Sequence, residues 1–303
     1  MWLWLALLSA ILLGFYDIAK KKALSKNGPL EVLLAATAIS TLLLSPCFFI
    51  YSGPWDHHLM LIGKAVLVSA SWVSGMIALK LLPITTVSTL KASRPFIVLL
   101  LSILIFGERL SALQYLGVAL ALVAVVLITR AGKSGDRSAD RKGYIAIAIS
   151  ILTGVASALY DKHIMASMEP LFVQSRTNLY ITLLLAVWVA ARWLMARRSR
   201  VAGCDSAQRG AIPEAAASDS ARRGFRWDWW LAVTALLITG ADMAYFFALG
   251  QEGSLLSVIS IMRRASVIVT FVFGVIIFKE KKLGGKFAAL GFLVAALVCL
   301  MLG

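Results

Sequence analysis

The stretch Ser257–Glu280, SVISIMRRASVIVTFVFGVIIFKE, decides the fold, because it is apolar enough to span a bilayer yet carries Arg263 and Arg264 near its middle. Each arginine at the centre of a membrane helix costs roughly 2.5–3.5 kcal/mol on insertion scales. Two such costs side by side are incompatible with a lipid-facing helix. We therefore expect both guanidinium groups to face a protein interior or a watery cavity, and the other helices to enclose it.

The composition is that of a polytopic membrane protein. Of 303 residues, 60% are hydrophobic and 15% are charged, whereas soluble domains are closer to half apolar. A net charge of +15 would suggest a nucleic-acid partner in a soluble protein, but basic residues also gather in the cytoplasmic loops of membrane proteins, so we expect none. The three cysteines, Cys47, Cys204 and Cys299, match no metal or disulfide spacing, and we expect no metal and no cofactor.

Ten apolar segments approach the length of roughly 20 residues that spans a bilayer. Each should be a helix, because irregular backbone cannot face lipid. They are residues 1–18, 29–51, 59–80, 83–106, 112–130, 143–161, 171–192, 229–250, 254–278 and 286–302. Residues 131–142 form a polar linker in mid-chain, and residues 195–226, rich in Ala, Ser, Gly and Arg, are expected to be a disordered loop.

The linker separates two five-helix segments, 1–130 and 143–303, that align with each other. An offset of 144 aligns Asp17 with Asp161. An offset of 172 gives four further matches: Ser88 with Ser260, Lys91 with Arg263, Phe106 with Phe278, and Glu108 with Glu280. An odd number of helices per repeat inverts one half relative to the other, as in many secondary transporters, whose sites lie near the midplane. The predicted fold class is therefore an all-α integral membrane protein with ten transmembrane helices in two inverted five-helix repeats.

The end of the fourth predicted helix resembles the signature of the drug/metabolite transporter superfamily, EamA type. The residues that carry the resemblance are Arg94-Pro95, Phe106-Gly107-Glu108-Arg109-Leu110 and Tyr115-Leu116-Gly117-Val118, repeated in part as Phe278-Lys279-Glu280-Lys281 with Gly291. The second copy departs from the family pattern, since Lys279 stands where glycine is usual. The resemblance covers essentially the whole chain and implies the EamA fold and transport, but not the substrate.

A narrower resemblance concerns the charges. Lys91 together with Arg263-Arg264 is similar to the basic cluster with which triose-phosphate translocators, of the same superfamily, hold a phosphate. This resemblance implies an anion-binding cluster. The candidate substrate-binding residues are Lys91, Arg94, Arg263, Arg264, Ser88 and Ser260.

Basic residues outnumber acidic ones within the predicted helices. Lys91, Arg94, Arg176, Arg263 and Arg264 stand against Asp17, Asp161 and Asp242. A phosphate or carboxylate of the substrate could supply the missing negative charge, because arginine forks suit those groups. Alternatively, backbone carbonyls, water or snorkelling satisfy the basic side chains.

The two adjacent arginines point about 100° apart on a helix, so one can bind ligand while the other pairs with a carboxylate. We expect Arg263, which matches Lys91 in the repeat, to share the substrate with Lys91, and Arg264 to pair with Asp242. Asp17 and Asp161 are either coupling residues that carry a proton or helix-end anchors paired with Lys20, Lys21 or Lys162. Glu108 and Glu280 are interpreted as structural helix corners.

Two arguments about orientation disagree. Odd-numbered loops hold about 22 of the 30 basic residues, whereas even-numbered loops hold Lys64, Arg109 and Lys162. The positive-inside rule then places the odd loops in the cytoplasm and both termini outside, whereas the family resemblance implies cytoplasmic termini.

The sequence thus predicts a secondary transporter of a small, anionic organic metabolite in a bacterial inner membrane, with proton or counter-substrate coupling. Export of amino acids or drugs, or flipping of a lipid-linked anion, are alternatives on the same fold. A membrane-embedded enzyme is disfavoured, because no metal-ligand cluster, Gly-x-Ser-x-Gly motif or acidic pair at helical spacing is present in the sequence. The sequence makes no prediction of the oligomeric state.

Overall fold

A computed structural model describes residues 1–24, 26–81, 87, 90–91, 93–131, 141–204, 226–266, 268–269 and 284–302. Within these ranges the regular secondary structure is helical, and no strand is found. The helices are α1 (Trp2–Leu24), α2 (Pro29–Leu43), α3 (Cys47–Ile50), α4 (Trp55–Leu81), α6 (Arg94–Phe106), α7 (Ala112–Ala131), α8 (Arg141–Met165), α9 (Pro170–Cys204), α11 (Trp229–Leu249), α12 (Leu256–Met262), the 3-10 turn η1 (Arg263–Ala265) and α14 (Gly284–Leu302).

Four of the described helices are long and apolar enough to cross a membrane, namely α1, α4 over Trp55–Ala78, α8 and α11. Shorter apolar helices are α2, α6 and the first part of α7, Ala112–Ala124. The all-helical membrane architecture is therefore confirmed for the described part of the chain. The count of ten spans stays a prediction.

The structure differs from the predicted segments at two places. The segment 29–51 is two helices, α2 and α3, separated at Leu44–Pro46, where proline cannot donate a helix hydrogen bond. Helix α9 continues beyond the predicted end at 192 to Cys204, so the prediction of disorder at 195–226 is wrong for residues 195–204. The remainder of that loop, 205–225, and most of the linker 131–142 lie outside the described residues.

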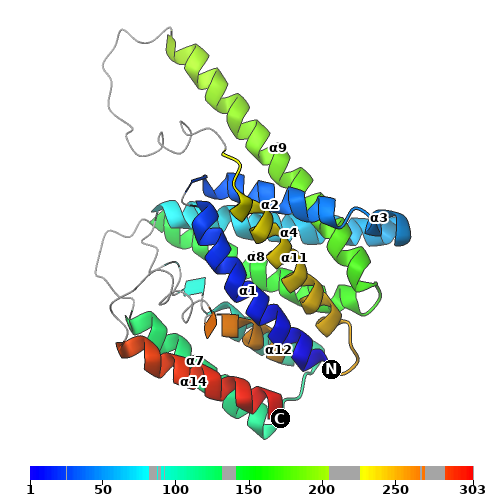
Figure 1. Cartoon of the computed structure of the whole chain (residues 1–303), viewed down its shortest axis with the longest axis vertical. Coiled ribbons are helices and arrows are strands. Elements are labelled where there is room, and N and C mark those ends of the chain that lie inside the picture. The colour runs from blue at the N-terminus through cyan, green and yellow to red at the C-terminus, as the bar shows by residue number, and fades with distance from the viewer. Residues whose placement is uncertain are drawn as a thin grey trace.

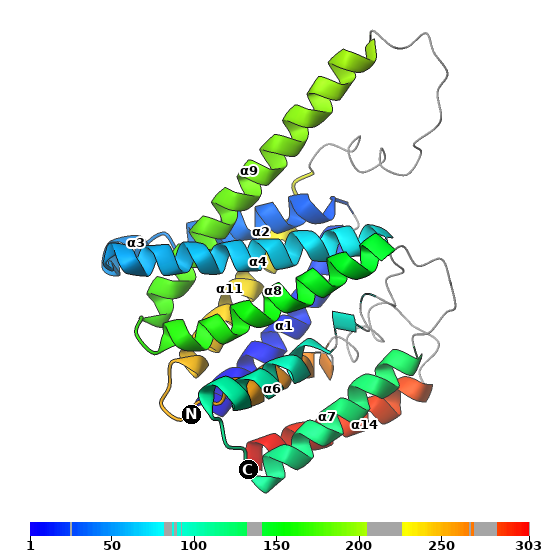
Figure 2. The same cartoon turned by 180° about the vertical axis from the view of Figure 1, so that it is seen from behind.

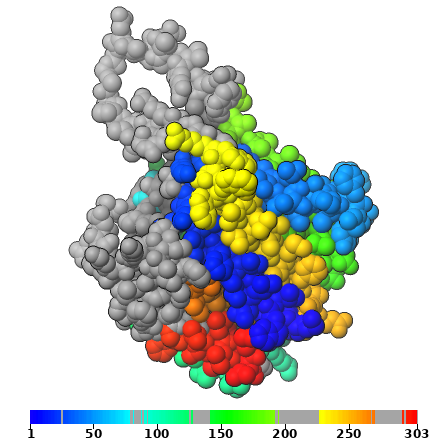
Figure 3. Space-filling view, in the orientation of Figure 1, coloured from blue at the N-terminus to red at the C-terminus, as the bar shows by residue number. Residues whose placement is uncertain are grey.

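The helices pair in a pattern that treats the two halves alike. Helix α1 packs along α11, while α4 packs along α8; α6, α7 and α2 pack on α12, α14 and α9, respectively. Figure 1 and Figure 2 show these neighbours, and Figure 3 shows α1 and α11 side by side on one surface. Exchanging the first five predicted helices with the last five reproduces this set of pairs. That is the arrangement expected of a repeat. The symmetry of the pairs supports the predicted repeat boundaries at 130 and 143, which stay a prediction.

The two chain ends lie at the same end of the molecule (Figure 1, Figure 2). We name this end the terminal face. It is formed by the starts of α1 and α4 and by the ends of α6, α8, α11 and α14, and its loops include 107–111 and 250–255.

The predicted corner after the fourth predicted helix is confirmed. Gly107 closes α6 in the left-handed conformation, at φ 62°, which glycine adopts without a side-chain clash. The next residue, Glu108, is 7% exposed and hydrogen-bonds to the start of α12. The second corner, Lys279-Glu280, lies outside the described residues.

Candidate functional site

A cavity of about 320 Å³ lies between α1, α6, α8, α11 and the α12–η1 segment. Binding sites for small molecules are typically about 300–1,000 Å³. Six of the nine candidate residues line it: Asp17, Arg94, Asp161, Ser260, Arg263 and Arg264. Its other lining residues are Leu13, Pro95, Val98, Ala158, Tyr245 and Ser266. Of the remaining candidates, Asp242 is bonded to the cavity-lining Arg263. Lys91 is not among the lining residues, and Ser88 lies outside the described residues.

Arg94 enters the cavity from the first turn of α6. Helix α6 begins at Arg94 because Pro95, lacking an N–H, is accommodated only in a first turn. Pro95 therefore stands at a helix start. The Arg94 guanidinium donates a hydrogen bond from Nη2 to the carbonyl oxygen of Gly154 on α8. A Cβ on Gly154 would lie 2.7 Å from Cζ of Arg94, so this contact requires glycine.

Arg263 is paired with a carboxylate. Its Nη2 donates to Oδ1 of Asp242 at 2.8 Å, and its guanidinium lies 4.3 Å from the centre of the Tyr245 ring. The expectation that Arg264 pairs with Asp242 is therefore wrong, and the arginine expected to share the substrate is the one already neutralised. The 3-10 geometry of η1 separates the directions of the two arginine side chains by about 120°, compared with about 100° in an α-helix.

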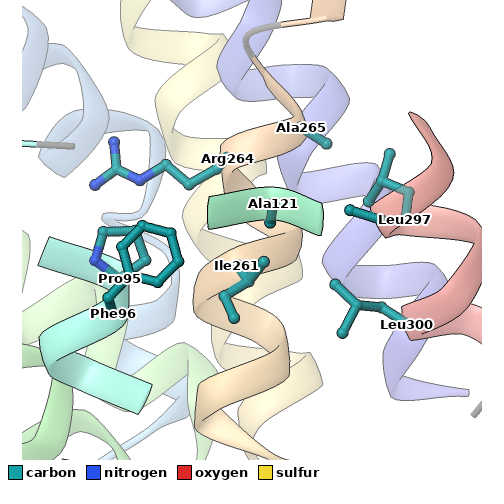
Figure 4. A pocket seen from close by; sticks show the side chains of 9 residues that line it. Pro95, Phe96, Ala121, Ile261, Arg264, Ala265, Leu297 and Leu300 are labelled. Atoms are coloured by element: carbon teal, nitrogen blue, oxygen red, sulfur yellow. The ribbon is translucent and has the colours of Figure 1, made fainter. Parts of the chain in front are cut away.

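Arg264 has no carboxylate partner among the described residues. In the described part of the chain, it forms no hydrogen bond and no ion pair within 4 Å. Arg94 and Arg263 repel it, while Asp17 attracts it from a greater distance. Figure 4 shows its guanidinium reaching from the α12–η1 segment over Pro95, away from the apolar side chains of Ala265, Leu297 and Leu300. Its charge is therefore available to the cavity.

The two repeat-matched carboxylates differ in their pairing. Asp161 forms an ion pair with Lys64 at 2.9 Å and accepts a hydrogen bond from the Tyr245 hydroxyl at 3.1 Å. Asp17 is exposed, and among the described residues it takes part in no ion pair within 4 Å. Its partners at longer range are Lys20 and Arg264. Of the alternatives left open above, the pairing of Asp161 with Lys162 is not found, because Lys162 bonds to Ser254 instead.

Lys64 is the charged residue that sequence reasoning missed. Counted above among loop residues, it lies ten residues into α4, is 3% exposed, and holds its ammonium 3.9 Å from the centre of the Phe246 ring. Its position inside the predicted span 59–80 could have identified it as a charged residue within the membrane. Tyr245 was missed as well, since an aromatic residue in an apolar helix carries no distinguishing pattern.

Lys91 and Arg176 lie apart from the cavity. Lys91 is half-buried against α4, where a Cβ on Gly75 would lie 2.6 Å from its Nζ. The charged groups that act on it, Lys20, Arg94 and Arg264, are all cationic. Arg176 donates to the Phe48 carbonyl at 3.0 Å and stacks on that ring. The structure therefore does not bring Lys91 and Arg263 together around one ligand site.

Metal binding finds no support within the described ranges, where no cluster of three or more His, Cys, Asp or Glu side chains could hold an ion. Several polar groups face the cavity. They combine arginines, carboxylates, serine hydroxyls and one tyrosine.

Comparison with known proteins agrees with this architecture. A crystal structure of a protein superposes on this chain with a TM-score of 0.72, covering 99% of this chain and 96% of that chain at 17% identity. At that identity the likeness shows the fold alone. No curated protein sequence matches the chain. Residues 1–130 match the family model described as the EamA-like transporter family. This first part of the chain is therefore similar to a family of membrane transporters.

Proposed function

We propose that this transporter moves a small anionic organic metabolite, phosphorylated or carboxylated, by secondary-active alternating access between two inverted repeats. The observation that carries the proposal is Arg264, a guanidinium that faces the central cavity with no carboxylate of the described chain within 4 Å. An intramembrane charge without a partner is expected to serve a ligand or ion pathway.

The charges around the cavity support an anionic solute. Among the described residues, Lys64 is neutralised by Asp161 and Arg263 by Asp242. Arg94 and Arg264 then face a single carboxylate, Asp17. This leaves an excess of one positive charge, before Lys91 and Lys20 nearby are counted. A carboxylate or phosphate accepts two parallel hydrogen bonds from an arginine fork, which fixes both its position and its charge.

The unequal pairing of the carboxylates supports a role for Asp17 in coupling. Asp161 is held between Lys64 and Tyr245. Asp17 faces the open cavity without such a partner, so a proton can reach it. We therefore assign proton coupling to Asp17 and a structural role to Asp161.

A solute screen tests the proposal. Purified protein should be stabilised against thermal unfolding by phosphorylated metabolites or organic acids, and liposomes containing it should accumulate the same solutes. Accumulation should increase when a pH gradient is imposed, if Asp17 carries the coupling proton. Stabilisation by neutral or cationic solutes alone would contradict an anionic substrate.

We also propose that the chain lies in a bacterial inner membrane with its terminal face outside. Lys64 is buried in α4 and leaves fewer basic groups for this face, whereas α1 ends in Lys20, Lys21 and Lys22 at the opposite one. Basic residues concentrate on the cytoplasmic side. A cysteine at position 2, in a chain whose native cysteines are replaced, should react with a membrane-impermeant thiol reagent in intact cells. Reaction only after lysis would reverse the orientation.

A further inference from the structure

Glu108 links the first half of the chain to the second at the terminal face. It follows the left-handed Gly107 directly after α6, yet its carboxylate lies at the start of α12. It accepts hydrogen bonds from the backbone N–H groups of Leu256 at 2.7 Å and Ser257 at 3.1 Å, and from the Ser257 hydroxyl. The family-type corner residue is thus a buried, multiply bonded carboxylate and not an exposed turn residue.

A second link joins the same loop to α8. Lys162 donates from Nζ to the backbone carbonyl of Ser254 and, at 3.0 Å, to its hydroxyl oxygen. The Ser254 hydroxyl in turn donates to the Leu249 carbonyl at the end of α11 at 2.8 Å. The ends of α6, α8 and α11 and the start of α12 therefore converge at one place on the terminal face.

These bonds lie one helical turn from the cavity. Ser257, bonded to Glu108, is three residues before the cavity-lining Ser260, and Lys162 follows the cavity-lining Asp161. Any movement that opens the cavity to the terminal face between α6 and α12 must separate Glu108 from Leu256 and Ser257. Hydrogen bonds to a charged acceptor are the stronger class, so these bonds oppose that separation.

We propose that Glu108 is a gating residue that latches the cavity shut toward the terminal face, and that the structure is the state closed at this face. The proposal rests on the alternating access proposed above. It assigns to the conspicuous Gly107-Glu108 corner a role in the transport cycle in addition to turning the chain. Glu108 acts by positioning α12 and does not touch the solute.

Sidedness of cavity access tests the latch. A chain with its native cysteines replaced carries a reporter, Ser260→Cys, in the cavity wall, and a membrane-impermeant thiol reagent is added from one side at a time. Glu108→Gln keeps the shape but removes the charge. Its amide oxygen can accept from one of the two backbone N–H groups, while its NH2 group places a donor against the other. We expect labelling from the terminal face to rise about tenfold or more, and labelling from the opposite face to fall.

The control is Glu252→Gln, an exposed carboxylate in the same loop, which should leave both rates unchanged. Loss of folding alone would raise labelling from both faces, so the opposite signs identify a latch. Should Glu108→Gln fail to fold, Ser257→Ala removes a single bond and should give a smaller rise of the same sign. Unchanged sidedness in a folded Glu108→Gln protein overturns the proposal. The labelling needs no solute, so its result tests the latch independently of the proposed substrate class.

Discussion

Replacing Lys64 with methionine is expected to destabilise the folded protein by about 3–5 kcal/mol, the cost of leaving a buried ion without its partner. Lys64 is 3% exposed and forms the ion pair of Asp161 at 2.9 Å. Methionine fills a similar volume, so the loss of stability measures the cost of leaving the Asp161 carboxylate without its partner and not the cost of a cavity. Unfolding of the purified protein in mixed detergent micelles would measure the change in the free energy of unfolding.

The double variant Lys64→Met/Asp161→Asn should recover most of this loss, because a buried ion pair replaced as a unit is often energetically neutral. Lys26→Met is the matched control. Lys26 pairs with Asp228 at the same 2.9 Å but is 56% exposed, and its loss should cost no more than about 1 kcal/mol. A Lys64→Met protein as stable as the Lys26→Met protein would contradict a buried, paired Lys64.

Replacing Arg264 with glutamine is expected to weaken the binding of the anionic solute at least about 30-fold, with little loss of stability. Truncating one partner of a desolvated charge pair typically costs 2 kcal/mol or more, and each 1.4 kcal/mol is tenfold in affinity. Stability should change little because no carboxylate of the described chain lies within 4 Å of Arg264. Ligand-induced thermal shifts and liposome uptake would measure affinity and transport together.

The neighbouring substitution Arg263→Gln is the control, and its expected effect is the reverse. It strands Asp242, whose side chain is 31% exposed, and should cost about 1–2 kcal/mol of stability, between the values for surface and buried pairs. Asp242→Asn should restore stability in the Arg263→Gln background. If Arg264→Gln left solute affinity intact while Arg263→Gln abolished it, the assignment of the two arginines would be reversed.

The sequence predicted the cavity lining better than the pairing within it. Asp17, Arg94 and Arg264 are rare charged residues inside apolar segments, and the cost of exposing such groups to lipid requires that they face inward. Which arginine meets Asp242 depends on where α12 ends and η1 begins, since that point sets the direction of each side chain. No periodicity in the sequence marks that point.

Lys64 illustrates a second limit of prediction from a single sequence, namely which helices are neighbours. Its partner Asp161 lies about a hundred residues further along the chain, and the two meet only because α4 packs along α8. Helix packing is determined by many weak contacts between small side chains, such as the mutual hydrogen bonds of Ser71 and Ser150. A single sequence does not show which helices are neighbours. The Lys64–Asp161 pair therefore follows from the fold.

Glu108 illustrates a third limit of prediction from the sequence. The sequence identified it as a corner and aligned it with Glu280, and the same offset of 172 aligns Ser257, which donates to Glu108, with Thr85. A carboxylate and a hydroxyl thus recur at corresponding positions of both halves, although Thr85 and Glu280 lie outside the described residues. The bond from Ser257 to Glu108 joins residues 149 positions apart and required the structure to be found.

The positive excess around the cavity has an electrical consequence. When the empty carrier turns an arginine-lined cavity from one side of the membrane to the other, its uncompensated charge moves through part of the transmembrane field. One elementary charge that crosses the whole field is worth about 2.3 kcal/mol per 100 mV. In the proposed cycle, a bound monovalent anion that enters without a coupling proton cancels this charge. Exchange of one solute for another would therefore proceed at a rate insensitive to membrane voltage, whereas net transport, which includes the empty return step, would be electrogenic.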